Sequence, residues 1–175
     1  MPRSRKSSSD AQLRDRRLVF YQEDIQATDA ALRDFLGRSK AKAALLVDKD
    51  GHLITKEGDT DRADTATVSA LVAGCFNATR EMARIMGEEE FTALFHQGRR
   101  DNIQLSLVGD RTIMAVLFDD STTIGMVRLY SAETARKLTM LFKKIAARGV
   151  KEQKDLGSGF QTAAANTLDD VFGDK

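Results

Sequence analysis

The longest periodic stretch of the chain lies between residues 64 and 86. Its apolar residues recur every three or four positions, which predicts one long helix with a face packed on a sheet. The residues that we assign to this packed face are Val68, Leu71, Val72, Cys75, Thr79, Met82 and Met86. Asp64 or Thr65 is the expected N-cap, because its side-chain oxygen can accept a hydrogen bond from a free amide of the first turn.

The opposite face of this helix consists mainly of small residues. They are Ala66, Ala70, Ala73, Gly74 and Asn77, followed only later by the charges Arg80, Glu81 and Arg84. A solvated face usually carries Lys and Glu, and a glycine in mid-helix costs about 1 kcal/mol relative to alanine. A small face with a glycine lets another backbone approach, so it is typical of packing against another helix or another chain. Alanine is also simply the best helix former, so both interpretations stand, and Gly74 favours an interface.

The chain before the long helix predicts another helix and then a hairpin. Residues 18–36 have one apolar helical face, and Gly37 is a plausible C-terminal stop. The apolar positions of that face are Leu18, Tyr21, Ile25, Leu32, Phe35 and Leu36. Residues 43–48 form a continuous apolar run typical of a central strand. A turn at 48–51, which ends in glycine, leads into a second strand at 52–56.

The chain after the long helix predicts three strands and a last helix. A strand at 91–97 is followed by strands at 103–108 and 111–118, which a tight turn joins. The residues predicted on one face of the first of these strands are Phe91, Ala93 and Phe95. Residues 124–130 could form a strand, but the apolar positions continue one helical stripe, so we predict a helix over 121–148.

The two ends of the chain differ from the central region, residues 18–148. Residues 1–17 contain six Arg or Lys, two Asp and few apolar residues, which predicts a disordered basic arm. Residues 149–159 are polar and rich in Lys and Gly, as in a linker. We therefore predict one domain between an arm and a linker.

The tail, residues 160–175, has the pattern of a short amphipathic helix. Leu168, Val171 and Phe172 stand at i, i+3 and i+4 among aspartates, as in helices that dock in a partner's groove. The residues expected to contact the partner are Phe160, Leu168, Val171 and Phe172. Such a segment cannot bury its apolar face alone, so we interpret it as a docking motif.

Composition narrows the classes of function. The 175 residues are 42% hydrophobic and 30% charged, which permits one packed domain with tails. The net charge of +1 gives no sign of nucleic-acid binding. The single cysteine excludes an internal disulfide and suits a reducing compartment. No signal peptide is apparent and no apolar run approaches the ~20 residues of a membrane span, so we expect a cytoplasmic location without integral membrane association.

The sequence contains no recognisable catalytic set. Neither the GxxxxGK[ST] phosphate loop nor the GxGxxG turn occurs, and His52 and His96 lie on different predicted strands without metal-ligand spacing. Cys75 falls on the predicted core face, so a structural thiol is expected rather than a nucleophile. The pair Arg99-Arg100 could present an arginine to a phosphate, although a solvated loop pair is the commoner case. We expect a binding module without cofactor or metal rather than an enzyme.

Three segments together resemble a known family. They are AALLVDKDGHLIT (43–55), ALVAGCFNATREMARIMGEEEFTALFHQG (70–98) and VGDRTIMAVLFDDSTTIGMVRLY (108–130). The chain from about residue 21 to residue 144 resembles a roadblock/dynein-light-chain (LC7) domain. Within that superfamily it is similar to the MglB group, the bacterial partners of the Ras-like GTPase MglA. The tail motif LDDVF is similar to the C-terminal segment of the same group.

The resemblance implies an α+β fold, the roadblock α/β sandwich with the order α-β-β-α-β-β-β-α. In this fold a five-stranded antiparallel sheet has helices on both faces. The resemblance also implies a homodimer through the edge strand and the long helix, across a two-fold axis. The residues that match the edge strand are Phe91, Ala93 and Phe95. Pairing there would cover an otherwise exposed sheet edge.

The resemblance further implies that two copies of the chain bind one MglA-like Ras-family GTPase through their long helices. Ala70 and Gly74 match small positions that face the GTPase, and we extend the predicted site to the whole small face. Members of the group act as GTPase-activating proteins without an arginine finger, by moving catalytic residues of the GTP-bound GTPase into place. The tail is implied to dock elsewhere on the GTPase and to tune exchange or affinity.

The main hypothesis is therefore a cytoplasmic homodimeric activator of an MglA-like GTPase, acting in cell polarity and gliding motility and located at cell poles. The alternative is a roadblock scaffold or adaptor, or a nucleotide-exchange regulator, that binds without changing GTP turnover. The basic serine-rich arm is longer than the family needs, and the charges near the end of the long helix depart from its pattern. An arm-specific partner or an altered GTPase affinity therefore stays open.

Overall fold

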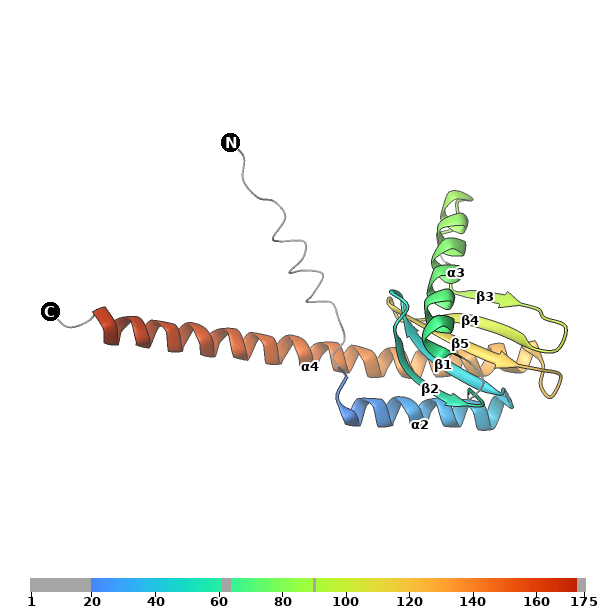
Figure 1. Cartoon of the computed structure of the whole chain (residues 1–175), viewed down its shortest axis with the longest axis horizontal. Helices are drawn as coiled ribbons and strands as arrows, with labels where there is room; N and C mark the ends of the chain where they lie inside the picture. The colour runs from blue at the N-terminus through green and yellow to red at the C-terminus, as the bar shows by residue number, and fades with distance from the viewer. Residues whose placement is uncertain (1–19, 61–63, 90, 173–175) are drawn as a thin grey trace. The chain divides into compact units, whose positions relative to one another are not determined.

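The computed structural model describes residues 20–60, 64–89 and 91–172, with side chains up to Gly149. The chain has two units, of which residues 21–141 form the first; the described part of the second is Phe20 and residues 142–172. The elements are α2 (Gln22–Ser39), β1 (Ala43–Asp48), β2 (Leu53–Gly58), α3 (Thr65–Ile85), β3 (Ala93–His96), β4 (Asn102–Val108), β5 (Thr112–Phe118) and α4 (Ile124–Phe172) (Figure 1). This is the order that the sequence predicts. The predicted basic arm, residues 1–17, lies outside the described residues.

All five strands belong to one antiparallel sheet in the order β2-β1-β5-β4-β3. Leu45 of β1 lies opposite Lys56 of β2 and Ala115 of β5, and Ala115 also lies opposite Leu105 of β4. The predicted α+β fold with a five-stranded antiparallel sheet is confirmed. Since β2 and β3 are the end strands, the long connection through α3 joins the two edges of the sheet.

Helices cover both faces of this sheet, α3 on one side and α2 with the first part of α4 on the other (Figure 1). Successive side chains of a strand point to opposite faces, so each strand contributes to two packing layers. The buried strand residues on the α3 side are Leu45, Val47, Leu105, Ile113 and Ala115. Those on the other side are Ala44, Leu46, Met114, Val116 and Phe118. The sheet is therefore buried on both faces.

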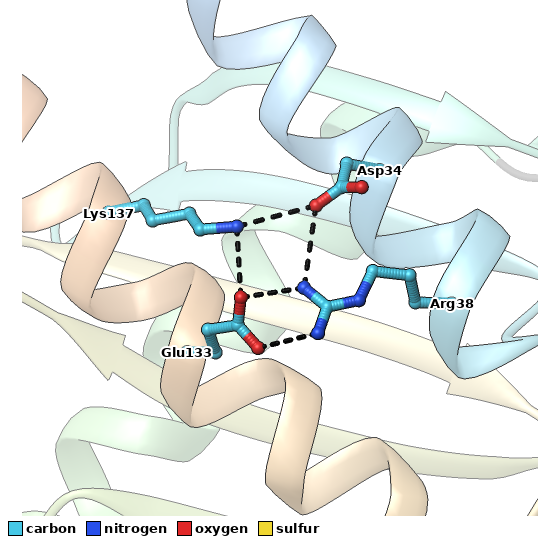
Figure 2. Close-up of polar contacts among 4 residues, drawn as sticks. All are labelled: Asp34, Arg38, Glu133 and Lys137. Atoms are coloured by element: carbon cyan, nitrogen blue, oxygen red, sulfur yellow. Dashed lines mark hydrogen bonds and ion pairs between the residues drawn. The ribbon is translucent and has the colours of Figure 1, made fainter.

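A network of four charged residues joins α2 to α4 (Figure 2). The guanidinium group of Arg38 donates two hydrogen bonds to the carboxylate of Glu133, at 2.6 and 2.8 Å. Lys137 Nζ lies 3.0 Å from Glu133 and 3.4 Å from Asp34, and the Arg38 guanidinium also lies 4.5 Å from the centre of the Tyr130 ring. The hydrogen bonds from Arg38 first, and then from Lys137, lower the pKa of Glu133 to about 2.

The predicted stop of the first helix at Gly37 is wrong. α2 begins at Gln22 and continues to Ser39, after which Lys40 adopts the left-handed conformation. A glycine inside a helix costs only about 1 kcal/mol. The hydrogen bonds of the last turn, including the one from the Lys40 amide to the Leu36 carbonyl at 3.0 Å, offset that cost.

β3 is shorter than the predicted strand, and it begins only after Phe91. The Phe91 ring lies 5.3 Å from the ring of Phe76 on α3, whereas the Phe95 ring stacks 6.1 Å from the ring of Phe118 on the other side of the sheet. The prediction that Phe91 shares a face with Ala93 and Phe95 is therefore wrong. The alternation of a strand does not apply to a residue that precedes the strand.

A helix is confirmed in the region predicted over 121–148, but α4 begins at Ile124 and continues beyond residue 148. The strand alternative for 124–130 is wrong. The backbone of α4 is helical through Phe172, so residues 149–159, which we predict as a linker, have a helical backbone. The Lys, Glu and Gln residues of this segment are good helix formers, and their propensity outweighs isolated glycines. In the described part of the chain, none of the helices is both long and apolar enough to cross a bilayer.

Candidate protein-binding surface on helix α3 and the sheet edge

The start of α3 is fixed by Asp64, one of the two predicted N-caps. Its carboxylate accepts hydrogen bonds from the amides of Ala66 (3.2 Å) and Thr67 (3.3 Å) and from the Thr67 hydroxyl (2.6 Å). The Thr67 hydroxyl first, and then these amides, lower the pKa of Asp64. The ionised cap also suits the positive end of the helix dipole. These hydrogen bonds therefore fix the residue at which the helix begins.

The face of α3 that packs on the sheet differs from the predicted one. The buried residues of the helix are Ser69, Val72, Ala73 and Phe76. They recur at i, i+3, i+4 and i+7, as expected for one helical face, but two of them, Ser69 and Ala73, are small. Of the residues assigned to the core from the sequence, Val72 is buried and Val68 packs beside it. The assignment of Leu71, Met82 and Met86 to the core is wrong.

Two of these misassigned residues, Leu71 and Met82, belong to an exposed apolar stripe on the far side of α3, and Met86 is exposed just after the helix ends. Leu71 is 67% exposed, Met82 56%, Ile85 75% and Met86 78%. The stripe consists of Leu71, Cys75, Ala78, Met82 and Ile85. These residues stand four and three apart in alternation, which is the spacing of a helix that packs on another helix. We call these five residues the apolar stripe; sequence reasoning found three of them but assigned them to the wrong contact.

The predicted small face lies between the buried face and the apolar stripe. Ala66, Ala70, Gly74 and Asn77 are exposed, whereas Ala73 is only 3% exposed and belongs to the core. We call the four exposed residues the small face. The burial of Ala73 follows from its position three residues before Phe76, on the edge of the buried face. The structure therefore brings four of the five predicted residues together on one surface.

The turn between β1 and β2 packs against part of the small face. A Cβ at Gly51, which has φ of +93°, would lie 3.0 Å from the Cα of Ala70. The side-chain amide of Asn77 donates a hydrogen bond to the carbonyl of Lys49 at 3.0 Å. The small residues predict that another backbone approaches this face. At Ala70 and Asn77, that backbone belongs to the chain's own turn between β1 and β2.

Gly74 does not take part in this contact. A Cβ at Gly74 would meet no atom within 4 Å, so nothing in the described chain requires a glycine there. A mid-helix glycine costs about 1 kcal/mol relative to alanine. The position is exposed and beside the apolar stripe, so a larger side chain there would change the surface and not the fold.

The turn between β1 and β2 is held in place by Asp48. Its carboxylate accepts from the amides of Asp50 (2.9 Å) and His52 (2.8 Å), and His52 Nδ1 lies 3.0 Å from it. Burial opposes ionisation, but these hydrogen bonds, led by the one from the His52 amide, lower the pKa of Asp48 overall. An ionised Asp48 therefore fixes the turn that borders the small face.

Next to α3 lies the edge strand β3, which among the described strands pairs only with β4. Of the three residues predicted at this edge, Ala93 is exposed and Phe95 is half-buried within β3, while Phe91 packs on α3 before the strand. His96 Nε2 lies 3.4 Å from Cys75 Sγ, which connects the end of β3 to the apolar stripe. Among the described residues, no group of three or more His, Cys, Asp or Glu is placed to hold a metal ion.

The described part of the predicted tail forms the end of α4. The backbone of α4 is helical from Phe160 to Phe172, which agrees with the predicted helical conformation. The side chains of Phe160, Leu168, Val171 and Phe172 lie outside the described ones. Their docking role stays a prediction.

The geometry of sheet, edge and protruding helix agrees with the comparison to known domains. Residues 28–118 match the Roadblock/LC7 domain. The chain belongs to the Roadblock/LC7 family. A comparison with curated protein sequences gives no significant match.

Solved structures narrow this assignment. The fold is similar to that of Myxococcus xanthus MglB, with 35% sequence identity over 73% of this chain and 96% of that one and a TM-score of 0.68. It is also similar to the gliding protein MglB of Thermus thermophilus, with 25% identity over the same shares and a TM-score of 0.68. A structure described as MglB with tetrameric arrangement matches at 25% identity and a TM-score of 0.69, again over 73% and 96% of the chains. The chain is thus an MglB-like roadblock protein.

Proposed function

We propose that this chain is a homodimeric GTPase-activating protein, without an arginine finger, for an MglA-like Ras-family GTPase. The observation that carries the proposal is that α3 exposes two adjacent surfaces of different character. One is the apolar stripe and the other is the small face. Two such surfaces on one helix suit two different partners, a second copy and a GTPase.

The apolar stripe and the β3 edge supply the contact with the second copy. The stripe has the spacing of helix-on-helix packing, and β3 lacks a second neighbour among the described strands. Both lie on the same side of the domain, where Cys75 and His96 are 3.4 Å apart. Pairing of two β3 strands would satisfy the open backbone groups of each edge and bring the two stripes together. Ala93 and Phe95 belong to this contact. Phe91 packs against α3 just before the strand and so helps to position β3.

The small face supplies the contact with the GTPase. Once the stripes are covered, Ala66, Ala70, Gly74 and Asn77 of each copy remain on the surface, so that two copies can bind one GTPase. The ordered turn beside Ala70 and Asn77 gives this surface a fixed shape, and Gly74 leaves room for a close approach. Preorganised surfaces bind with a smaller entropy cost.

Activation then consists of ordering the GTPase. The chain would bind the GTP-loaded form near its switch regions and hold the GTPase's own catalytic residues in place. The tail, with Phe160, Leu168, Val171 and Phe172, would dock elsewhere on the GTPase and tune exchange or affinity. Through an MglA-like partner, the protein would act in the cytoplasm and at the cell poles, in polarity and gliding motility.

The test is the single-turnover rate of GTP hydrolysis by the cognate MglA-like GTPase, with and without this protein. We expect a concentration-dependent acceleration of about tenfold or more. Gly74→Arg is expected to abolish the acceleration and the binding without unfolding the chain, because its side chain would stand in open space. Gly37→Arg is the matched control, since Gly37 is also an exposed helical glycine with no atom near its Cβ position.

The outcomes separate the two candidate functions and test the assigned GTPase surface. Binding without acceleration would replace the activator by the scaffold or exchange regulator. Unchanged binding of the Gly74→Arg variant would show that the small face is not the GTPase surface. Equal losses for Gly74→Arg and Gly37→Arg would point to a general effect of the new charge.

A further inference from the structure

A hollow of about 580 Å³ lies at the end of the sheet, between the β3–β4 loop and the start of α4. Its size is within the range of sites that bind small ligands or peptide side chains. Phe95, Phe118 and Ile124 line its apolar part. The ring of Phe95 stacks on the buried ring of Phe118 with centroids 6.1 Å apart, so an aromatic pair borders the apolar part.

The loop beside this hollow is held in a fixed position. Lys42 Nζ lies 2.7 Å from Asp101 on the loop and 2.8 Å from Asp119 at the end of β5. A Cβ at Gly98 would collide with the carbonyl oxygen of Asp101, so the loop closes tightly on itself. The charge of Lys42 is therefore paired with these two aspartates. The same contacts hold Arg99 and Arg100 of the loop at the rim of the hollow.

The other charged residues that line the hollow are positive on one side of it and negative on the other. Arg99 and Arg100 are exposed on the loop side, and neither forms an ion pair with a described residue. Asp120 is exposed in the lining contributed by the chain after β5, and it too lacks an ion pair in the described part of the chain. The hollow therefore suits a ligand with an aromatic group, an anionic group and a cationic group close together.

The C-terminal residues of the chain have this chemistry. Phe172 is followed by Gly173, Asp174 and Lys175, with Asp169 and Asp170 before it. We propose that the hollow binds the C-terminal segment, residues 168–175, of a second copy of this chain. Phe172 would enter the aromatic part, Asp174 would pair with Arg99 and Arg100, and Lys175 would pair with Asp120. In this proposal the segment comes from a second copy, so the binding is measured between chains.

This binding goes beyond the proposed GTPase regulation and does not rest on it. A segment held in the hollow of another copy is not free to dock on a GTPase, so self-binding would withdraw it as the protein concentration rises. The test below contains no GTPase, and its failure would leave the proposed activation untouched.

The experiment is a fluorescence-anisotropy titration of a labelled peptide, residues 160–175, with the full chain. We expect saturable binding that the double variant Arg99→Glu, Arg100→Glu weakens by about tenfold or more. The matched control is Lys143→Glu, Lys144→Glu, which reverses another exposed adjacent basic pair and should change the affinity less than about twofold. A peptide carrying Asp174→Lys should bind the Arg99→Glu, Arg100→Glu variant better than the unmodified peptide does.

Two further results bear on the same inference. A peptide with Phe172→Ala should lose binding, while the full chain with Phe172→Ala should bind the unmodified peptide more tightly, because its own segments no longer compete. Absence of saturable binding, or equal weakening by the two charge-reversed pairs, would overturn the proposal. Circular dichroism of each variant checks that the fold is retained.

Discussion

The two faces of the sheet are covered in different ways. On the side of α2 and α4, Leu32, Phe35, Met114 and Leu138 are almost completely buried. On the side of α3, the helix buries only four of its own residues and exposes the apolar stripe. The first face is closed by the chain itself, and the second is closed by one helix whose outer side is still apolar.

This difference separates stability from recognition within one small domain. Residues of the closed face contribute to folding, since their apolar area is removed from water by the chain alone. Residues of the apolar stripe gain little from folding, because they stay in water until a partner covers them. Substitutions on the closed face should therefore change the free energy of unfolding. Substitutions on the apolar stripe should change the affinity for a partner.

The largest expected effect is on the closed face. Phe35→Ala should lower the free energy of unfolding by about 3–5 kcal/mol, because it removes a fully buried ring and leaves a cavity. Met82→Ala on the apolar stripe should change it by less than about 0.5 kcal/mol under conditions where the chain is monomeric. Urea denaturation at low protein concentration measures both. Similar losses for the two variants would show that α3 is covered within the chain.

The next effect concerns the apolar stripe. Ile85→Asp should raise the dimer dissociation constant by about thirtyfold or more, because a charge would be buried between two helices. Leu129→Asp is the control, since Leu129 is a similarly exposed leucine on α4. Sedimentation velocity over a range of concentrations gives the association state of each variant. An unchanged dimer for Ile85→Asp would remove the apolar stripe from the dimer contact.

Replacing two glycines, Gly58 and Gly74, by alanine should change the stability in opposite directions. Gly58 has φ of +92°, and a Cβ there would collide with the carbonyl oxygen of Lys42, so Gly58→Ala should destabilise by about 2 kcal/mol. Gly74 is helical with open space around it, so Gly74→Ala should stabilise by about 0.5–1 kcal/mol. Thermal unfolding of both variants tests the opposite signs. A destabilising Gly74→Ala would mean that this glycine is needed by the fold.

The strands and the N-cap of α3 could be predicted from the sequence because each depends on local chemistry. Residues 43–48 form an apolar run, and the structure has a strand with the same bounds. Asp64 or Thr65 was predicted as the N-cap from side-chain chemistry and position, and Asp64 caps the helix. The predicted stop at Gly37 failed because a single glycine is a weak signal against the hydrogen bonds of a continuing helix.

The packed face of α3 could not be predicted in the same way. Hydrophobic periodicity finds apolar stripes, but it does not tell which stripe meets the sheet and which meets a partner. Leu71 and Met82 are larger than Ser69 and Ala73, so they look more like core residues. Small residues are buried here because α3 lies close to the strands. The alternating spacing of the apolar stripe was the available signal for a second helix.

The candidate site was predicted in part. Four of the five small residues do share an exposed surface, because their spacing alone determines which side of the helix they occupy. The contact of Ala70 and Asn77 with the β1–β2 turn could not be found from the sequence, since it depends on how the hairpin folds over the helix. The position of Phe91 failed for the same reason, because the start of β3 is set by its pairing with β4.

The smallest expected effect comes from the charged network that joins α2 to α4. The pKa of Glu133 is lowered to about 2, so its ionised form contributes stability above the ordinary carboxyl pKa of ~4.5. That contribution is lost as the pH falls from ~4.5 through about 2. Because the network is solvent-exposed, Glu133→Gln should lower the melting temperature at pH 6 by only about 1–3 °C.

The pH dependence distinguishes this electrostatic effect from a change in packing. At pH 2 most of the difference between Glu133→Gln and the unmodified chain should disappear, because the native carboxyl has then begun to protonate as well. High salt at pH 6 should reduce the difference too, since it screens exposed charges. Glu89→Gln, at an exposed carboxyl after α3, should show little difference at either pH. A loss for Glu133→Gln that is the same at pH 6 and pH 2 would mean that Glu133 joins α2 to α4 by packing and not by charge.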